Sequence, residues 1–138
     1  MQLGISTVGV ACAVALAACT TNSTRDTSAD EGARELAEAL QGLTPGAPVN
    51  CMPNLHGQGR MEVIDDNTIL FRDGATVYVQ HPKGGCPGID NGRYTLVLRQ
   101  VGAHQICQGD IHQLIDLRNN VHGGSCVFGP FVPYRRAN

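Results

Sequence analysis

Four cysteines constrain the fold of this chain more than any other feature of its sequence. Cys51, Cys86, Cys107 and Cys126 are spread over residues 51–138, a stretch too short to bury a large core. An even number of cysteines in a small domain indicates disulfide bonds if the protein is exported, because cytosolic thiols stay reduced. Whether these cysteines are paired therefore depends on the compartment that the N-terminus specifies.

The N-terminus has the pattern of an export signal. Residues 3–18 form an uncharged, mostly apolar run that leads into Leu16-Ala17-Ala18-Cys19, and polar residues follow at once. The run is shorter than a transmembrane helix of about 20 residues, so we expect a cleaved signal peptide over residues 1–18. The pattern resembles bacterial lipoprotein signals, in which the cysteine receives a diacylglyceryl group and becomes the first mature residue.

This resemblance implies lipidation of Cys19, and Thr20 in place of Asp implies the outer membrane by the sorting rule of these lipoproteins. Two or more acyl chains such as palmitate hold a protein at a membrane, whereas one chain binds reversibly. Two alternatives stay open. Cleavage after Ala15-Leu16-Ala17 would release a soluble periplasmic protein, and a signal that is not cleaved would remain as an anchor.

Residues 19–50 are expected to hold the lipidated cysteine, a polar tether and one short helix. Residues 20–30 are rich in Thr, Ser, Asn and Asp, which predicts a flexible tether. Apolar residues then recur at helical spacing over residues 31–43, with Ser28 and Glu31 as a capping box and Gly42 as the end. Residues 44–48 form a second, proline-stiffened linker. So short a helix either docks on the domain or frays, or it binds a partner.

Residues 51–138 are expected to form a β-rich domain that is cross-linked by disulfides. Alternating apolar residues predict six strands, and Asp73-Gly74 predicts a tight antiparallel hairpin. The expected strands cover residues 61–65, 68–71, 75–79, 94–99, 106–117 with a bend near Gly109, and 127–132. Consecutive strands with short connections indicate a mainly β fold, a small antiparallel barrel or sandwich of about five to six strands with two disulfides.

Four cysteines allow three disulfide connectivities. We favour nested pairing, Cys51 with Cys126 and Cys86 with Cys107, because the first pair would clip the ends of the domain together and the second would close a local loop. The alternative use of four cysteines is a zinc site. Structural zinc sites usually contain close Cys-x-x-Cys pairs, and this sequence has none.

The sequence carries no recognisable catalytic motif, and an exported domain with an even cysteine count offers no free thiolate. A net charge of -2 and a pI near 6.2 argue against nucleic-acid binding. Arg135-Arg136 form only a small basic tail. The remaining candidate chemistry is a metal site that would combine His104, His112 or His122 with Asp110, although no two of the five histidines have a metal-ligand spacing of two or four.

Several short motifs occur in an order similar to that of a known family. They are Asp65-Asp66 before Thr68-Ile69-Leu70-Phe71, Val77-Tyr78, Cys86-Pro87-Gly88, Cys107 before Gly109-Asp110, and Cys126 before Gly129, Phe131 and Pro133-Tyr134. Residues 51–134 therefore resemble a family of small exported lipoproteins of Gram-negative bacteria, catalogued only as a domain of unknown function. The resemblance implies an exported, cysteine-paired β-domain and brings no enzyme activity.

We therefore expect a cell-envelope lipoprotein that faces the periplasm and acts as a non-enzymatic binding or scaffolding module. Its expected partners are the membrane, through the lipid anchor, and another envelope protein; neither nucleic acid nor a cofactor is expected. The alternative is a periplasmic metal-binding or metal-dependent protein that uses His104, His112 or His122 with Asp110.

Overall fold

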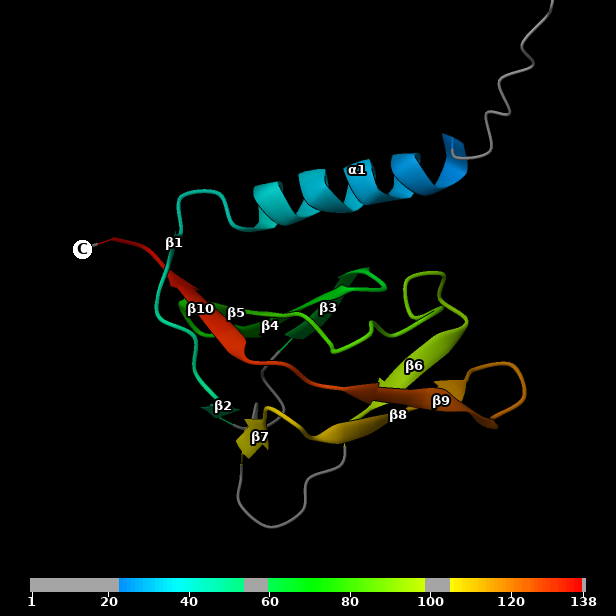
Figure 1. Ribbon diagram of the computed structural model, residues 1–138. Helices are drawn as coiled ribbons and strands as arrows, with labels where there is room; N and C mark the ends of the chain where they lie inside the picture. The colour runs from blue at the N-terminus through cyan, green and yellow to red at the C-terminus, as the bar shows by residue number, and fades with distance from the viewer. Residues whose placement is uncertain (1–22, 54–59, 99–104, 138) are drawn as a thin grey trace, which may run out of the picture.

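The computed structural model describes residues 23–53, 60–98 and 105–137, and these form three layers. Helix α1 (Ser23–Ala39) covers one face of a five-stranded sheet, and a three-stranded sheet covers the other face (Figure 1). All strand neighbours are antiparallel. The expected mainly β fold is confirmed, and it is a sandwich of sheets with two disulfides.

In the described parts of the chain, ten strands build these sheets. The five-stranded sheet has the order β1-β10-β5-β4-β3, with bounds Thr44–Pro45, Phe131–Arg135, Thr76–Gln80, Thr68–Asp73 and Arg60–Asp65. The three-stranded sheet has the order β6-β8-β9, with bounds Tyr94–Val97, Ile111–Asp116 and His122–Val127. A short ladder joins β2 (Cys51–Pro53) to β7 (Gln105–Cys107).

The predicted strands over residues 61–65, 68–71 and 75–79 are confirmed as β3 to β5, and the strand predicted over residues 94–99 is β6, which ends at Val97. The expected bend near Gly109, where φ is 91°, separates β7 from β8. The strand predicted over residues 127–132 is wrong, because the chain leaves one sheet at Val127 and enters the other at Phe131. The linker predicted over residues 44–48 is also wrong, since β1 pairs with β10.

Strand β4 lies at the centre of the molecule and is buried on both faces. Ile69 and Phe71 point into the core between the sheets, while Leu70 points toward α1. Successive strand residues face opposite sides of a sheet, so the uninterrupted apolar run in this strand serves two cores at once. Three phenylalanines with ring centroids 5.8–6.2 Å apart fill the core between the sheets: Phe71, Phe128 and Phe131.

Helix α1 docks on the first sheet through Leu36 and Ala39, and Leu40 and Leu43 in the turn that follows add to this contact. The helix begins at Ser23, so the predicted start at residue 31, with Ser28 in the capping box, is wrong. Relative to alanine, each polar residue makes a helix less favourable by no more than about 0.7 kcal/mol. This cost is too small to end a helix whose later turns pack on the sheet. The chain leaves the helix through a turn with Gly42 at φ 74°, as expected. Within the described residues, no helix is long and apolar enough to cross a membrane.

The two disulfides differ from the nested pairing favoured from the sequence. Cys51 is joined to Cys107, and Cys86 is joined to Cys126, so the two loops interleave along the chain. Nested pairing is wrong because Cys51 and Cys107 lie directly opposite each other in the β2–β7 ladder. The second bond ties the segment after β5 to β9 and thus cross-links the two main sheets.

Candidate functional site

The residues proposed for a metal site do not assemble into one in the described part of the chain. His112 is fully buried, lies opposite Cys126 in the β8–β9 ladder, and packs on Phe128 with ring centroids 4.4 Å apart. His122 is exposed, and the Asp110 carboxylate accepts a hydrogen bond from the amide N–H of Cys107. No three His, Cys, Asp or Glu side chains among the described residues are placed to hold a metal ion. His104 and Cys19 lie outside the described residues.

Burial lowers the pKa of the His112 imidazole, and the Asp110 carboxylate opposes this shift only in part. The native state then binds fewer protons at this residue than the unfolded chain does, so native stability is full above about pH 6.5, the ordinary histidine pKa, and falls as the pH drops below it. We expect a lower free energy of unfolding in urea at pH 5.5 than at pH 7.5. The difference should shrink in His112→Gln and persist in the exposed control His81→Gln. An equal difference in both variants would contradict this role.

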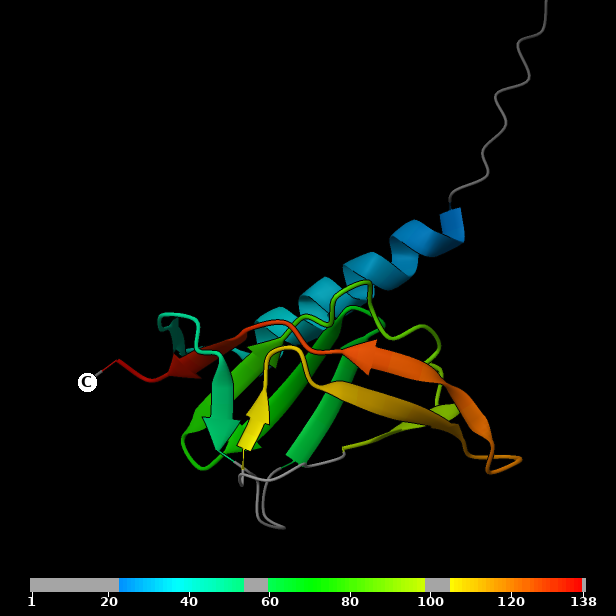
Figure 2. The same ribbon diagram turned by 60° about the horizontal axis from the view of Figure 1, so that its bottom comes forward.

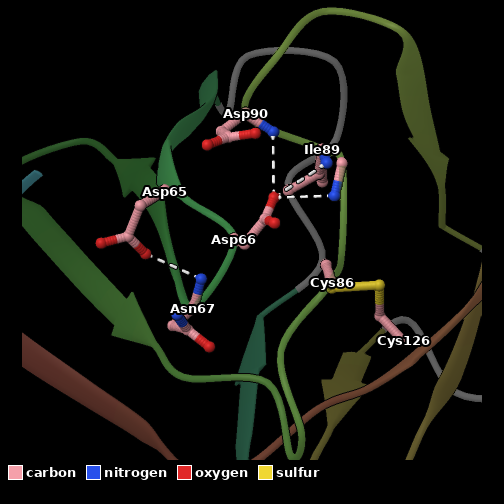
Figure 3. The surroundings of a disulfide bond; sticks show 8 residues. Asp65, Asp66, Asn67, Cys86, Ile89, Asp90 and Cys126 are labelled. Atoms are coloured by element: carbon pink, nitrogen blue, oxygen red, sulfur yellow. Dashed lines mark hydrogen bonds between the residues drawn. A yellow bond between two sulfur atoms is a disulfide. The ribbon is translucent and has the colours of Figure 1, made fainter. Parts of the chain in front are cut away.

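The turn Asp65-Asp66-Asn67 lies near the second disulfide and forms hydrogen bonds with the loop that carries Cys86 (Figure 3). One carboxylate oxygen of Asp66 accepts hydrogen bonds from the backbone N–H groups of residues 88–90, at 2.9, 3.1 and 3.4 Å. The carbonyl of Asp66 also accepts a bond from the N–H of Cys86 at 2.6 Å. Burial raises the pKa of the Asp90 carboxyl, and the neighbouring Asp66 carboxylate raises it further. This turn therefore fixes the loop that carries Cys86.

A pocket of about 670 Å³ lies where α1 ends, next to the β4–β5 turn and the C-terminal residues. Three of the side chains that line it are arginines, and the others are apolar or uncharged. The lining residues are Ala39, Gln41, Leu43, Arg72, Gly74, Ala75, Val77, Arg135 and Arg136. We call this the arginine pocket.

The strand order brings the arginines together. Arg72 stands near the end of β4, and Arg135 stands at the end of β10. Strand β5 lies between these two strands and is antiparallel to both. The C-terminal ends of β4 and β10 therefore lie at the same end of the sheet, on either side of β5. The Nε of Arg135 donates to the hydroxyl of Thr76 on β5, with 3.0 Å between the atoms. This bond directs the guanidinium along the edge.

The electrostatics of the arginine pocket favour an anion. Arg72 pairs with Glu62, with 3.0 Å between the guanidinium nitrogen and the carboxylate oxygen, and both side chains are about one third exposed. Arg135 and Arg136 are exposed, and no acidic side chain among the described residues lines the pocket. The C-terminal end of α1 contributes a partial charge of about -0.5, which opposes the arginines. This charge is smaller in magnitude than the combined positive charge of Arg135 and Arg136. Planar guanidinium groups suit carboxylates and phosphates, which accept two parallel hydrogen bonds.

The sequence indicated only part of this site. Arg135-Arg136 were visible as a small basic tail, whereas nothing near Arg72 marked it as their neighbour. Arg72 and Arg135 are far apart in the sequence, so the pairing of β10 with β5 has to be known before the two residues can be placed near each other.

Comparison of the chain with protein-family models, with curated proteins and with solved structures finds no match. The resemblance to small exported lipoproteins therefore stays a prediction from the sequence motifs.

Proposed function

We propose that this protein is a lipid-anchored, non-enzymatic module of the cell envelope that binds an anionic group of another envelope component. The observation that carries the proposal is the arginine pocket, whose lining combines three arginines with apolar residues such as Leu43 and Val77. The signal-like run before Cys19 supports the membrane attachment. The interleaved disulfides fit an oxidising compartment outside the cytoplasm.

The ligand class follows from what lines the pocket. Its volume lies within the range of about 300–1,000 Å³ that is common for small-molecule sites. Arg72 and Arg135 would bind a carboxylate or phosphate, while Leu43 and Val77 would contact an apolar part of the same ligand. The described side chains that line the pocket include no Ser, Cys, His, Asp or Glu, so binding is supported better than catalysis.

The position of the pocket fits a module that reaches away from its membrane. The arginine pocket lies at the C-terminal end of α1, whereas Cys19 precedes the N-terminal end of the helix. A helix of 17 residues is about 25 Å long, so the N-terminal end of α1, which follows the expected anchor in the sequence, is about this far from the end of the helix that borders the pocket. The pocket would therefore face the periplasm.

The anion site predicts a specific loss of binding. Titration of the protein with inorganic phosphate, followed by NMR of the arginine Nε–H groups, should shift the signals of Arg72 and Arg135. The double variant Arg135→Gln, Arg136→Gln should weaken binding by about 10-fold or more, because each charge-assisted hydrogen bond contributes roughly 1.5–3 kcal/mol. Arg34→Gln on the exposed face of α1 is the matched control and should bind normally. Equal binding by both variants would refute the pocket as the site.

The lipid anchor predicts that a radioactive fatty acid labels the chain in cells that process it. Cys19→Ser should abolish the label, because the acyl chains are attached through the thiol of Cys19, and it should lower the share of the protein in the membrane fraction. Both results are read on one gel of fractionated cells. A wild-type chain without label would show that the lipoprotein assignment is wrong, and it would leave the arginine pocket to be judged by the phosphate titration.

A further inference from the structure

The turn between β8 and β9 exposes two large apolar side chains at its tip. Leu117 is 60% exposed and Val121 is 53% exposed. The turn that carries them is held by hydrogen bonds between Asp116 N and the Val121 carbonyl and between Asn120 N and the Asp116 carbonyl, both 2.8 Å. Apolar side chains that stay in water forgo the free energy that burial would contribute. A binding surface that covered Leu117 and Val121 would therefore be stabilised by their burial. We call residues 117–121 the hairpin tip.

Positive charge surrounds the hairpin tip. Arg118 lies within it, and Arg93 lies beside it, because the carbonyl of Arg93 accepts a hydrogen bond from the N–H of Leu117. The nearby carboxylate of Asp116 is already used, by Arg93 Nε at 3.0 Å and by the N–H of Arg118 at 2.8 Å. Residues 117–127 contain no Asp or Glu. The charge of Arg93 is offset by its ion pair with Asp116, so Arg118 supplies the net positive charge at the tip. An apolar tip that carries an arginine has the chemistry of a segment that binds an anionic lipid surface.

The outward-facing row of β8 adds two isoleucines to the tip, with Gln113 between them. Ile111 and Ile115 occupy the same outward-facing row as Leu117, since every second strand residue faces the same side. Ile111 is 62% exposed. The inward-facing residues of β8, by contrast, are buried against the first sheet. The outer face of this sheet thus extends the apolar contact beyond the two tip residues.

The hairpin tip and the beginning of α1 lie at the same end of the molecule (Figures 1 and 2). Strands β8 and β9 extend past the first sheet toward this end, while the C-terminal end of α1 lies at the other (Figure 2). The arginine pocket borders that end of α1. Cys19 precedes Ser23 by four residues, which span at most about 14 Å when fully extended. A lipid on Cys19 would therefore hold a bilayer close to the end that carries the tip.

We propose that the hairpin tip is a second membrane contact, with Leu117 and Val121 inserted among the lipids and Arg93 and Arg118 against anionic headgroups. This inference rests on the proposed lipid anchor, which brings the surface within reach. The exposed face of α1 carries Glu31, Glu35 and Glu38, which an anionic surface repels. Attraction at the tip and repulsion at the helix together set one orientation of the anchored domain. That orientation points the arginine pocket away from the bilayer.

The chain contains no tryptophan, so Leu117→Trp introduces a single fluorescent reporter at the tip. The lipidated protein is reconstituted into vesicles of phosphatidylethanolamine and phosphatidylglycerol with brominated acyl chains. We expect the emission of Leu117→Trp to shift to shorter wavelength and to be quenched roughly two-fold, because interfacial side chains sit about 5–10 Å into the boundary between headgroups and acyl chains. Val49→Trp, at an exposed valine near β1, is the matched control and should stay unquenched. Adding Arg118→Glu to Leu117→Trp should reduce the quenching.

Flotation of the vesicles separates the two proposals. If the protein floats and Leu117→Trp is not quenched, the tip contact is refuted and the anchor stands. If both reporters are quenched alike, the domain lies on the surface without a preferred face, which also refutes the contact. If the protein does not float, the anchor is refuted. The Leu117→Trp chain is then tethered by an N-terminal histidine tag to nickel-chelating lipids in the same vesicles, and its quenching decides the tip contact.

Discussion

Replacing both Cys86 and Cys126 by alanine is expected to lower the free energy of unfolding by about 4 kcal/mol, the chain-entropy value for a closed loop of 40 residues. Both cysteines are buried, at 0% and 1% exposure, and their bond joins the two main sheets. A loss of this size is a large part of the total stability of a small domain, about 5–15 kcal/mol. Chemical denaturation of the oxidised variant and wild type measures it.

The control for this experiment is the double variant Cys51→Ala, Cys107→Ala, whose loop spans 56 residues and whose bond lies within one short ladder. The two double variants should each retain the other disulfide, so neither should contain free thiols after denaturation. Two free thiols in the variant that lacks Cys86 and Cys126 would show that Cys51 and Cys107 are not partners. Peptide mass mapping of the non-reduced wild type reads the pairing directly.

Phe128→Ala is expected to cost about 4 kcal/mol, within the range of 3–5 kcal/mol for removing a buried phenylalanine. The side chain is fully buried, and its ring contacts Phe71, Phe131 and His112. Its backbone also bridges the elements, because its N–H donates to the Asp110 carbonyl at 3.0 Å and its carbonyl accepts from the N–H of Gly109 at 2.9 Å. Truncation therefore leaves a cavity where the chain crosses between sheets.

The same position offers a graded control. Phe128→Leu keeps most of the buried volume and should cost less than half as much as Phe128→Ala, roughly 1.5 kcal/mol. Val121→Ala, in the exposed turn, should change stability by no more than about 0.5 kcal/mol. Urea denaturation of all three variants at one pH provides the comparison. A cost for Phe128→Ala similar to that of Val121→Ala would mean that the core between the sheets is not packed around this ring.

The strands could be predicted because their signals are local. Alternation along β3 and β5 and the Asp73-Gly74 turn depend only on neighbouring residues, and Gly74 adopts the positive φ of 56° that this turn requires. The boundary between β9 and β10 was missed for a physical reason. Val127 to Phe131 is apolar enough to read as one strand, yet Pro130 and the change of sheet interrupt it.

The disulfide pairing and the arginine pocket could not be predicted because both depend on long-range register. The nested pairing assumed that the first and last cysteines of the domain close it. In the structure, Cys107 instead lies opposite Cys51, a relation set by how two distant strands pair. Arg72 and Arg135 likewise lie near each other only because β4 and β10 both pair with β5. Composition and spacing carry no information on which distant segments become neighbours.

The interleaved disulfides also bear on biogenesis. A chain exported N-terminus first presents Cys51 and then Cys86 to the oxidising compartment, before Cys107 and Cys126 emerge. An oxidase that joins cysteines in order of arrival would therefore make Cys51–Cys86 and Cys107–Cys126, and neither bond is native. Native pairing then requires thiol–disulfide exchange through a mixed disulfide, the reaction that a disulfide isomerase catalyses. Cells that oxidise this protein without an isomerase should accumulate it in a mispaired form.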